Sequence, residues 1–201
     1  MSVGCAIVMY TIALLLLFVV AQRKSALVGV KTPLGLILAA ATAGVIVFCT
    51  VRGSPVSVDL TLTLACLVVC AASDLVTGLI FDAVTATAAC GIIFSALVEQ
   101  HVAVAVLGAF TGIVPLLGLY ATTRGRGIGL GDVKLGGIIG AGIGSVDALG
   151  AIGTAFVAGA VCYAPLLVTG RMGRGDRVPF APFMAVGTLV LVAVRVVHGH
   201  G

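Results

Sequence analysis

The sequence predicts an all-α integral membrane protein with about eight transmembrane helices and its N-terminus outside. Of the 201 residues, 61% are hydrophobic, and the mean hydropathy is +1.30. Only 9% are charged, whereas a soluble domain carries roughly 25% charged residues. So few charged side chains cannot cover a soluble surface. The chain is therefore expected to form a single polytopic membrane domain over residues 1–201.

Apolar segments follow one another along the chain, and each is expected to be a membrane helix. The first has no basic residue before it and is followed by Arg23 and Lys24. A cleavable signal peptide has the opposite polarity, so this segment is expected to be retained. Several segments are shorter than the roughly 20 residues of a perpendicular span, and the sixth is expected to be tilted or partly buried among the others. The segments lie near residues 3–21, 33–50, 56–72, 83–98, 102–120, 134–147, 149–168 and 180–197.

The basic residues indicate the orientation. With the N-terminus outside, the inner loops are 22–32, 73–82, 121–133 and 169–179. Nine of the 11 basic residues lie in these loops or at the edge of the third, which is the bias that cytoplasmic loops show. Asp74 and Asp132 are then expected on the cytoplasmic side. The nine are Arg23, Lys24, Lys31, Arg124, Arg126, Lys134, Arg171, Arg174 and Arg177, and the other two are Arg52 and Arg195.

The distribution of charge and cysteine limits the partners and cofactors. The net charge of +4 comes from basic residues in loops between apolar runs, so anionic lipid headgroups or a membrane-bound substrate are expected, and not nucleic acid. All six cysteines lie in or at the ends of apolar runs, where small packing residues are expected. They form no Cys-x-x-Cys pair, so no structural zinc site is predicted, and no metal or cofactor is expected.

Glycine recurs at four-residue spacing in two predicted helices, at Gly108 and Gly112 and at Gly136, Gly140 and Gly144. In membrane helices this spacing lets two backbones approach closely. Tight packing within the chain is the favoured interpretation, and a homodimer is the alternative.

Two carboxylates bracket a short predicted inner loop, Asp74 at its start and Asp82 at its end. Charged groups near membrane helices are rare and usually functional, although a solvated loop acid is the alternative for Asp74. Asp82 is also well placed to cap the following helix, because an acid at a helix N-terminus meets unpaired N–H groups and a favourable dipole.

A glycine-rich stretch precedes the other acid, Asp132. Four glycines at alternate positions, among them Gly129 and Gly131, give a flexible backbone that admits the close approach of a peptide main chain. A phosphate-binding loop is excluded because no Walker lysine followed by Ser or Thr is present. Lys134 either lies near the site and favours ionisation, or extends to the lipid headgroups.

Three motifs in order make the chain resemble the type IV prepilin peptidases, which are integral membrane aspartyl proteases. Gly129–Asp132 reads Gly-x-Gly-Asp, and Asp74 with Asp82 is similar to the family's first acidic motif. Pro179–Phe183, which by itself indicates only the start of a helix, is similar to the family's Pro-Phe-x-Pro. The resemblance covers roughly residues 60–190.

The resemblance implies a membrane aspartyl endopeptidase with Asp74 and Asp132 as the catalytic dyad. Two close carboxylates share one proton, so the ionised one can activate a water and the protonated one can support the oxyanion. The sequence does not distinguish the two roles. Asp82, Gly129, Gly131 and Lys134 are the expected binding or supporting residues.

The same resemblance implies the substrate and the location. The substrate would be a prepilin or pseudopilin with a short basic leader, a glycine before the cut and an apolar helix after it. The enzyme would lie in the inner (plasma) membrane as a multi-pass protein, with its active site facing the cytoplasm.

The sequence departs from the larger members of the family in two places. Phe81 stands where many members have proline. The first inner loop, 22–32, leaves no room for the cytoplasmic Cys-x-x-Cys zinc domain of the longer members, so the chain resembles the short form, and methyltransferase activity is not predicted.

The main alternative is a small ion-coupled transporter that uses the same acids as a proton relay. Transporters usually place such acids near the bilayer midplane and often have two related halves, and this chain shows no repeat. A non-catalytic scaffold is a third interpretation. Presenilin-like proteases share Gly-x-Gly-Asp, but their Tyr-Asp and Pro-Ala-Leu motifs do not occur here.

Overall fold

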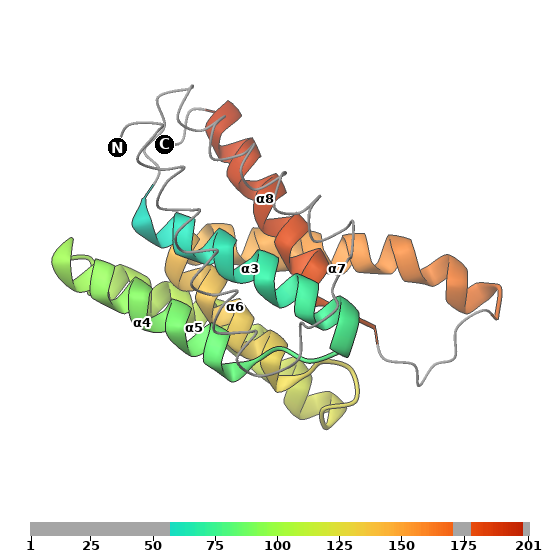
Figure 1. Ribbon diagram of the computed structural model, residues 1–201. Helices are drawn as coiled ribbons and strands as arrows, with labels where there is room; N and C mark the ends of the chain where they lie inside the picture. The colour runs from blue at the N-terminus through green and yellow to red at the C-terminus, as the bar shows by residue number, and fades with distance from the viewer. Residues whose placement is uncertain (1–56, 171–177, 199–201) are drawn as a thin grey trace.

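The computed structural model describes residues 57–170 and 178–198, and every regular element in these ranges is an α-helix (Figure 1). The helices correspond to the last six predicted segments. The first two predicted segments, 3–21 and 33–50, lie outside the described residues. The helices are α3 (Val58–Thr77), α4 (Asp82–Val98), α5 (Val102–Thr123), α6 (Leu130–Ile143), α7 (Ser145–Val168) and α8 (Ala181–Val197).

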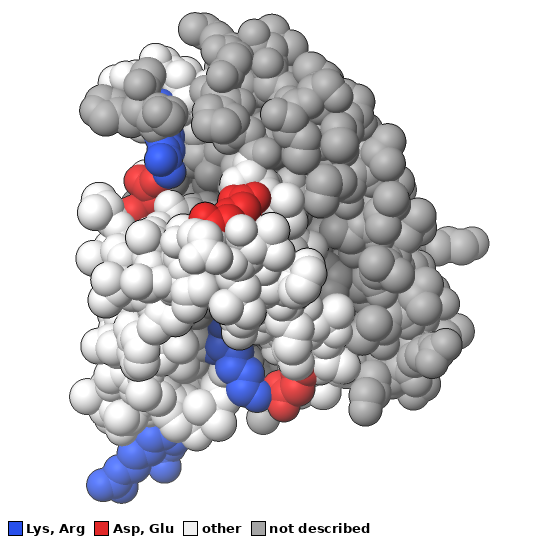
Figure 2. Space-filling view, turned by 90° about the vertical axis from the view of Figure 1, so that its left-hand side faces the viewer, with Lys and Arg blue, Asp and Glu red and all other residues white. Residues whose placement is uncertain are grey.

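Three of the described helices have the length and composition of membrane-spanning helices. Apolar stretches long enough to cross a bilayer occur in α3, α5 and α7, and α4 and α8 are apolar but shorter. Figure 2 shows the charged side chains of one face near two opposite ends, with uncharged surface between them. The prediction of an all-helical membrane protein is confirmed. The count of eight helices and the outward N-terminus stay predictions.

The short helix α6 lies at the centre of the bundle. It packs against each of the other five described helices, and eight of its 14 residues are buried. This confirms the expectation that the sixth segment is buried among the others. Most of the surface of α6 contacts other helices and not lipid. Its length therefore need not match the thickness of the bilayer.

Glycine allows α6 to pack closely on α5. Gly108 lies against the backbone of Gly140, and Gly112 lies against the backbone of Gly136. A Cβ atom at any of these four positions would overlap main-chain atoms or a buried leucine. The glycine spacing therefore serves packing within the chain, as expected. Gly144 has a different role, since its φ of 92° forms the junction between α6 and α7.

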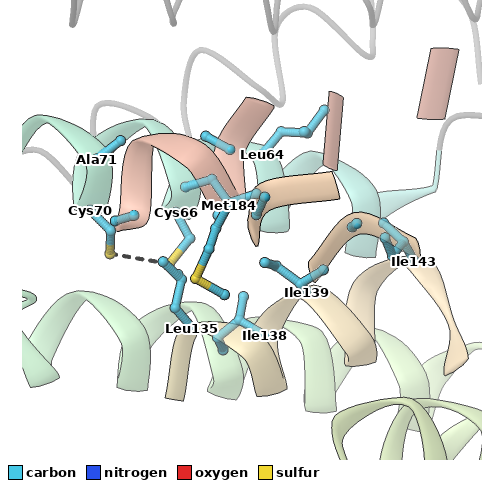
Figure 3. Close-up of a cluster of buried hydrophobic side chains, with 14 of the residues drawn as sticks. Leu64, Cys66, Cys70, Ala71, Leu135, Ile138, Ile139, Ile143 and Met184 are labelled. Carbon is cyan, nitrogen blue, oxygen red and sulfur yellow. Dashed lines mark hydrogen bonds between the residues drawn. The ribbon is translucent and has the colours of Figure 1, made fainter. Parts of the chain in front are cut away.

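The hydrophobic core lies between α3, α6 and α8. Figure 3 shows Met184 of α8 close to Leu135 and Ile139 of α6 and to Cys66 of α3, and all four side chains are fully buried. Cys66 and Cys70 lie on one face of α3 with their sulfur atoms 3.8 Å apart. These two cysteines are packing residues, as the sequence predicted.

Two helix ends near the acids differ from the prediction. α3 continues past residue 72 to Thr77, and Gly78, with a φ of 64°, ends it by donating its N–H to the carbonyl oxygen of Asp74. α6 begins at Leu130 rather than at residue 134. Both acids, Asp74 and Asp132, therefore lie in helical turns and not in loops. The helical backbone restricts where their side chains can point.

Because Gly112 contacts backbone and Gly118 faces open space on the same helix, the two positions provide a matched pair. Gly112→Ala is expected to destabilise the protein by about 1–3 kcal/mol through overpacking. Gly118→Ala should be neutral or slightly stabilising, because alanine is the better helix former. Thermal unfolding in detergent, followed by circular dichroism, measures both. Equal midpoints for the two variants would contradict the close α5–α6 contact.

Candidate active site

Asp74 is a buried carboxylate in the last turn of α3. Its residue is 9% exposed, and its Oδ2 atom accepts a hydrogen bond of 3.0 Å from the backbone N–H of Ala181. The two residues are 107 positions apart in the chain. A buried carboxylate requires such a partner, because burial without a hydrogen bond costs several kcal/mol. This bond joins the end of α3 to the start of α8.

The start of α8 has one backbone donor that the helix cannot use, and Asp74 accepts it. Ala181 is the first residue of the helix, so its N–H has no intrahelical partner. Pro182 has no N–H, and Phe183 donates to the carbonyl oxygen of Phe180 at 3.0 Å. The positive end of the helix dipole also faces the carboxylate. The Pro-Phe-Ala-Pro motif thus contacts an acid, and the sequence, which indicated a helix start and a family motif, gave no sign of this contact.

Asp132 is the third residue of α6. Its Oδ2 atom accepts a hydrogen bond of 3.1 Å from the N–H of Gly129, and its buried Oδ1 atom has no hydrogen-bond partner among the described residues. Asp132 lies outside the three candidate membrane spans. Burial raises the pKa of Asp132 to about 6, the Gly129 N–H opposes this rise, and the negative charge of Asp74 adds to it. Asp74 therefore lies close enough to influence Asp132.

The two glycines of the motif have different surroundings. A Cβ atom at Gly131 would lie 2.8 Å from the Cβ of Ile80, so the absence of a side chain lets the α3–α4 loop pack on the start of α6. Gly129 is exposed, and the nearest atom to a Cβ there would be Oδ2 of Asp132, at 3.4 Å. The backbone beside Asp132 is therefore open to an approaching chain.

Lys134 and Asp82 form an ion pair of 2.6 Å at the same end of the bundle. Their side chains are 47% and 75% exposed, and exposed pairs contribute little to stability. Asp82 is in the first turn of α4, where the dipole favours an acid, but Phe81 occupies the cap position and no side chain caps the helix. The predicted side-chain cap is therefore wrong, because Asp82 lies within the helix and pairs with Lys134.

The other described carboxylates all have a basic partner. Asp59 contacts His101 at 2.6 Å, and Asp147 contacts Arg195 at 2.9 Å. Glu99 also lies within 3.7 Å of His101. The hydrogen bond that His101 donates to Asp59 raises the pKa of His101, which favours its charged form. In the described part of the chain, only Asp74 and Asp132 lack a basic group within ion-pair distance.

Comparison with known proteins gives the family. The model of the type IV leader peptidase family matches residues 61–164, which is just over half of the chain and includes both acids. The chain belongs to the type IV leader peptidase family. The prepilin leader peptidase/N-methyltransferase of Bacillus subtilis (strain 168) is 36% identical over 84 residues, which are 42% of this chain and 34% of that protein. No solved structure matches.

The matched region of this leader peptidase family member ends before α8. The family model covers α3, α4, α5, α6 and most of α7, whereas the Pro-Phe-Ala-Pro segment lies beyond residue 164. The chain also spans about a third of the length of the relative from Bacillus subtilis. The hydrogen bond between Ala181 and Asp74 thus joins a segment that the family model does not match to an acid that it does match.

The raised pKa of Asp132 predicts a pH dependence of stability. Its folded pKa of about 6 lies above the ordinary value of 3.8, so the folded state binds the proton more tightly than the unfolded state. The stabilisation is complete below the ordinary value and is lost as the pH rises through about 6. Asp132→Asn cannot ionise and should flatten this fall. Thermal midpoints in detergent between about pH 4 and about pH 8 test it, and an unchanged slope would contradict it.

Proposed function

We propose that this protein is an aspartic-type membrane endopeptidase that removes the basic leader from type IV prepilins or pilin-like proteins. The observation that carries the proposal is the pair Asp74 and Asp132. Neither has a basic partner among the described residues, and both lie within the region that matches the leader peptidase family. An acid that is not neutralised by a salt bridge can exchange a proton during a reaction.

Peptide hydrolysis by this pair needs one proton between two carboxylates. We assign the shared proton to Asp132, whose pKa burial raises to about 6, and the role of base to Asp74. The N–H of Ala181 supports the charge on Asp74. Asp74 takes a proton from a water molecule, and the water oxygen attacks the carbonyl carbon of the peptide bond.

The proton of Asp132 completes the reaction. It passes to the carbonyl oxygen as the tetrahedral intermediate forms, which neutralises the developing oxyanion. Asp74 then gives the proton it received to the nitrogen of the leaving amine, and the C–N bond breaks. As the intermediate collapses to the carboxyl product, its hydroxyl proton returns to Asp132, so the pair ends in its starting state.

The surroundings of the acids support a peptide substrate in extended form. The exposed backbone at Gly129 gives a main chain access to Asp132, and Gly131 is required for the loop packing that places this turn. The basic loops of the sequence favour the cytoplasmic face of the inner membrane for this end of the bundle. The family implies the remaining features of the substrate, a basic leader and an apolar helix after the cut.

Cleavage of a co-expressed prepilin, read as a mobility shift, tests the proposal. Asp74→Ala and Asp132→Ala, made separately, should each lower cleavage by about a thousandfold or more, the effect of removing a catalytic group in other proteases. Asp82→Ala should lower it by less than about tenfold, because it removes an exposed ion pair. All variants are checked for membrane insertion.

Asp147→Ala is the matched control, since it removes a carboxylate from a different part of the bundle. It should cleave like the wild type. Near-normal cleavage by either Asp74→Ala or Asp132→Ala would remove that residue from the dyad. A wild type that cleaves no prepilin, but drives proton-coupled uptake into vesicles, would support the transporter instead.

A further inference from the structure

An apolar groove of about 480 Å³ runs between α4 and α5, with α6 as its floor. Its walls include Ala89 and Ile92 of α4 and Ala109 and Ile113 of α5, and its floor includes Gly137 and Ile138 of α6. Asp82 and Lys134 are the charged residues among those that line it. The groove therefore has an uncharged body and one polar end.

The groove opens on the apolar surface of the bundle. Ile93 and Phe110 line it and are 54% and 60% exposed, so they border its mouth. Alanine is frequent deeper on both walls, for example at Ala89 and Ala109. Small side chains of this kind let a helix from outside approach the wall closely in a membrane.

The polar end of the groove adjoins the candidate active site. Lys134 lies two residues after Asp132 on α6, and Asp82 follows the loop whose Ile80 packs against Gly131. A segment that leaves the groove at this end therefore reaches the end of the bundle where the first turn of α6 carries Asp132. The other end of the groove, near Ala96 and Val102, lies at the α4–α5 turn.

We propose that this groove binds the apolar helix of the substrate and presents the bond before that helix to Asp74 and Asp132. The inference rests on the proposed function, because it takes the substrate from it. The wall from Thr85 to Ala96 is about 17 Å long at a rise of 1.5 Å per residue, which accommodates about three helical turns. The uncharged body of the groove would contact the apolar helix of the substrate, and the polar end would contact the leader that precedes this helix.

Charge complementarity favours the substrate helix over other occupants. An apolar helix suits the uncharged body. At the polar end, the Asp82 side chain is 75% exposed and its ion pair with Lys134 is weak in water, so a basic residue of the leader can replace Lys134 as its partner. A lipid chain would fill the body but would place no peptide bond at the end of the bundle that carries the acids. A second copy of the chain, or one of its own segments 3–21 and 33–50, would place no scissile bond at the acids.

Filling the groove tests the proposal. Ala89→Phe and Ala109→Phe each put a ring into the groove and should raise KM for a full-length prepilin by about tenfold with little change in kcat. Ala160→Phe is the matched control, because Ala160 is exposed on α7 and does not line the groove. For a prepilin peptide shortened within its apolar helix, wild type and groove variants should have the same KM, since the contacts that the ring blocks are already absent.

Photo-crosslinking provides a measurement that does not depend on activity. A photoreactive residue at Ala89, in an Asp132→Ala background, should crosslink to the apolar helix of a bound prepilin, and the same residue at Ala160 should not. Crosslinks to lipid, to a second copy or to residues 3–50 of the same chain would overturn the assignment.

The two failures are distinguishable. If the wild type cleaves prepilin and the groove variants keep its KM, the groove is not the binding site, and the proposed function stands. If the wild type cleaves no prepilin, the proposed function fails, and the assigned occupant of the groove fails with it.

Discussion

The close contact between α5 and α6 is the constraint on which the rest of the structure depends. Four glycines, at positions 108, 112, 136 and 140, bring the two backbones together, and this places α6 in the middle of the bundle. Because α6 packs against each of the other described helices, its first turn has a fixed position relative to the ends of α3 and α4. Asp132 lies in that turn. The close packing of the glycines of α5 on those of α6 therefore fixes where the Asp132 carboxylate lies.

The second acid is positioned by an unpaired backbone donor. A helix leaves its first N–H groups without partners, and in a buried position each must find one. At the start of α8, Asp74 accepts the N–H of Ala181, while Pro182 has none to offer. One bond thus satisfies a buried carboxylate and a helix end together, and α3 and α8 are held at the site.

The two acids also differ from the other described carboxylates in their electrostatic surroundings. Asp59, Asp82 and Asp147 each lie within ion-pair distance of a basic group. Asp132 has no such group among the described residues, its Oδ1 atom is buried, and burial raises its pKa to about 6. This contrast supports the proposal that Asp74 and Asp132 act as a pair that shares one proton.

The sequence alone determined the class of the protein, the six described helices and the candidate acids. Apolar composition excludes a soluble fold whatever the packing, and a motif such as Gly129–Asp132 can be read without coordinates. The ends of α3 and α6 were misplaced by a few residues, because glycine and aspartate indicate a turn while cap geometry decides where it begins. Only the tertiary structure decided the contact of Ala181 with Asp74, the partner of Lys134 and the groove between α4 and α5. Each of these depends on residues far apart in the chain. The local sequence does not indicate which helices pack side by side, so it does not predict which helix ends come together.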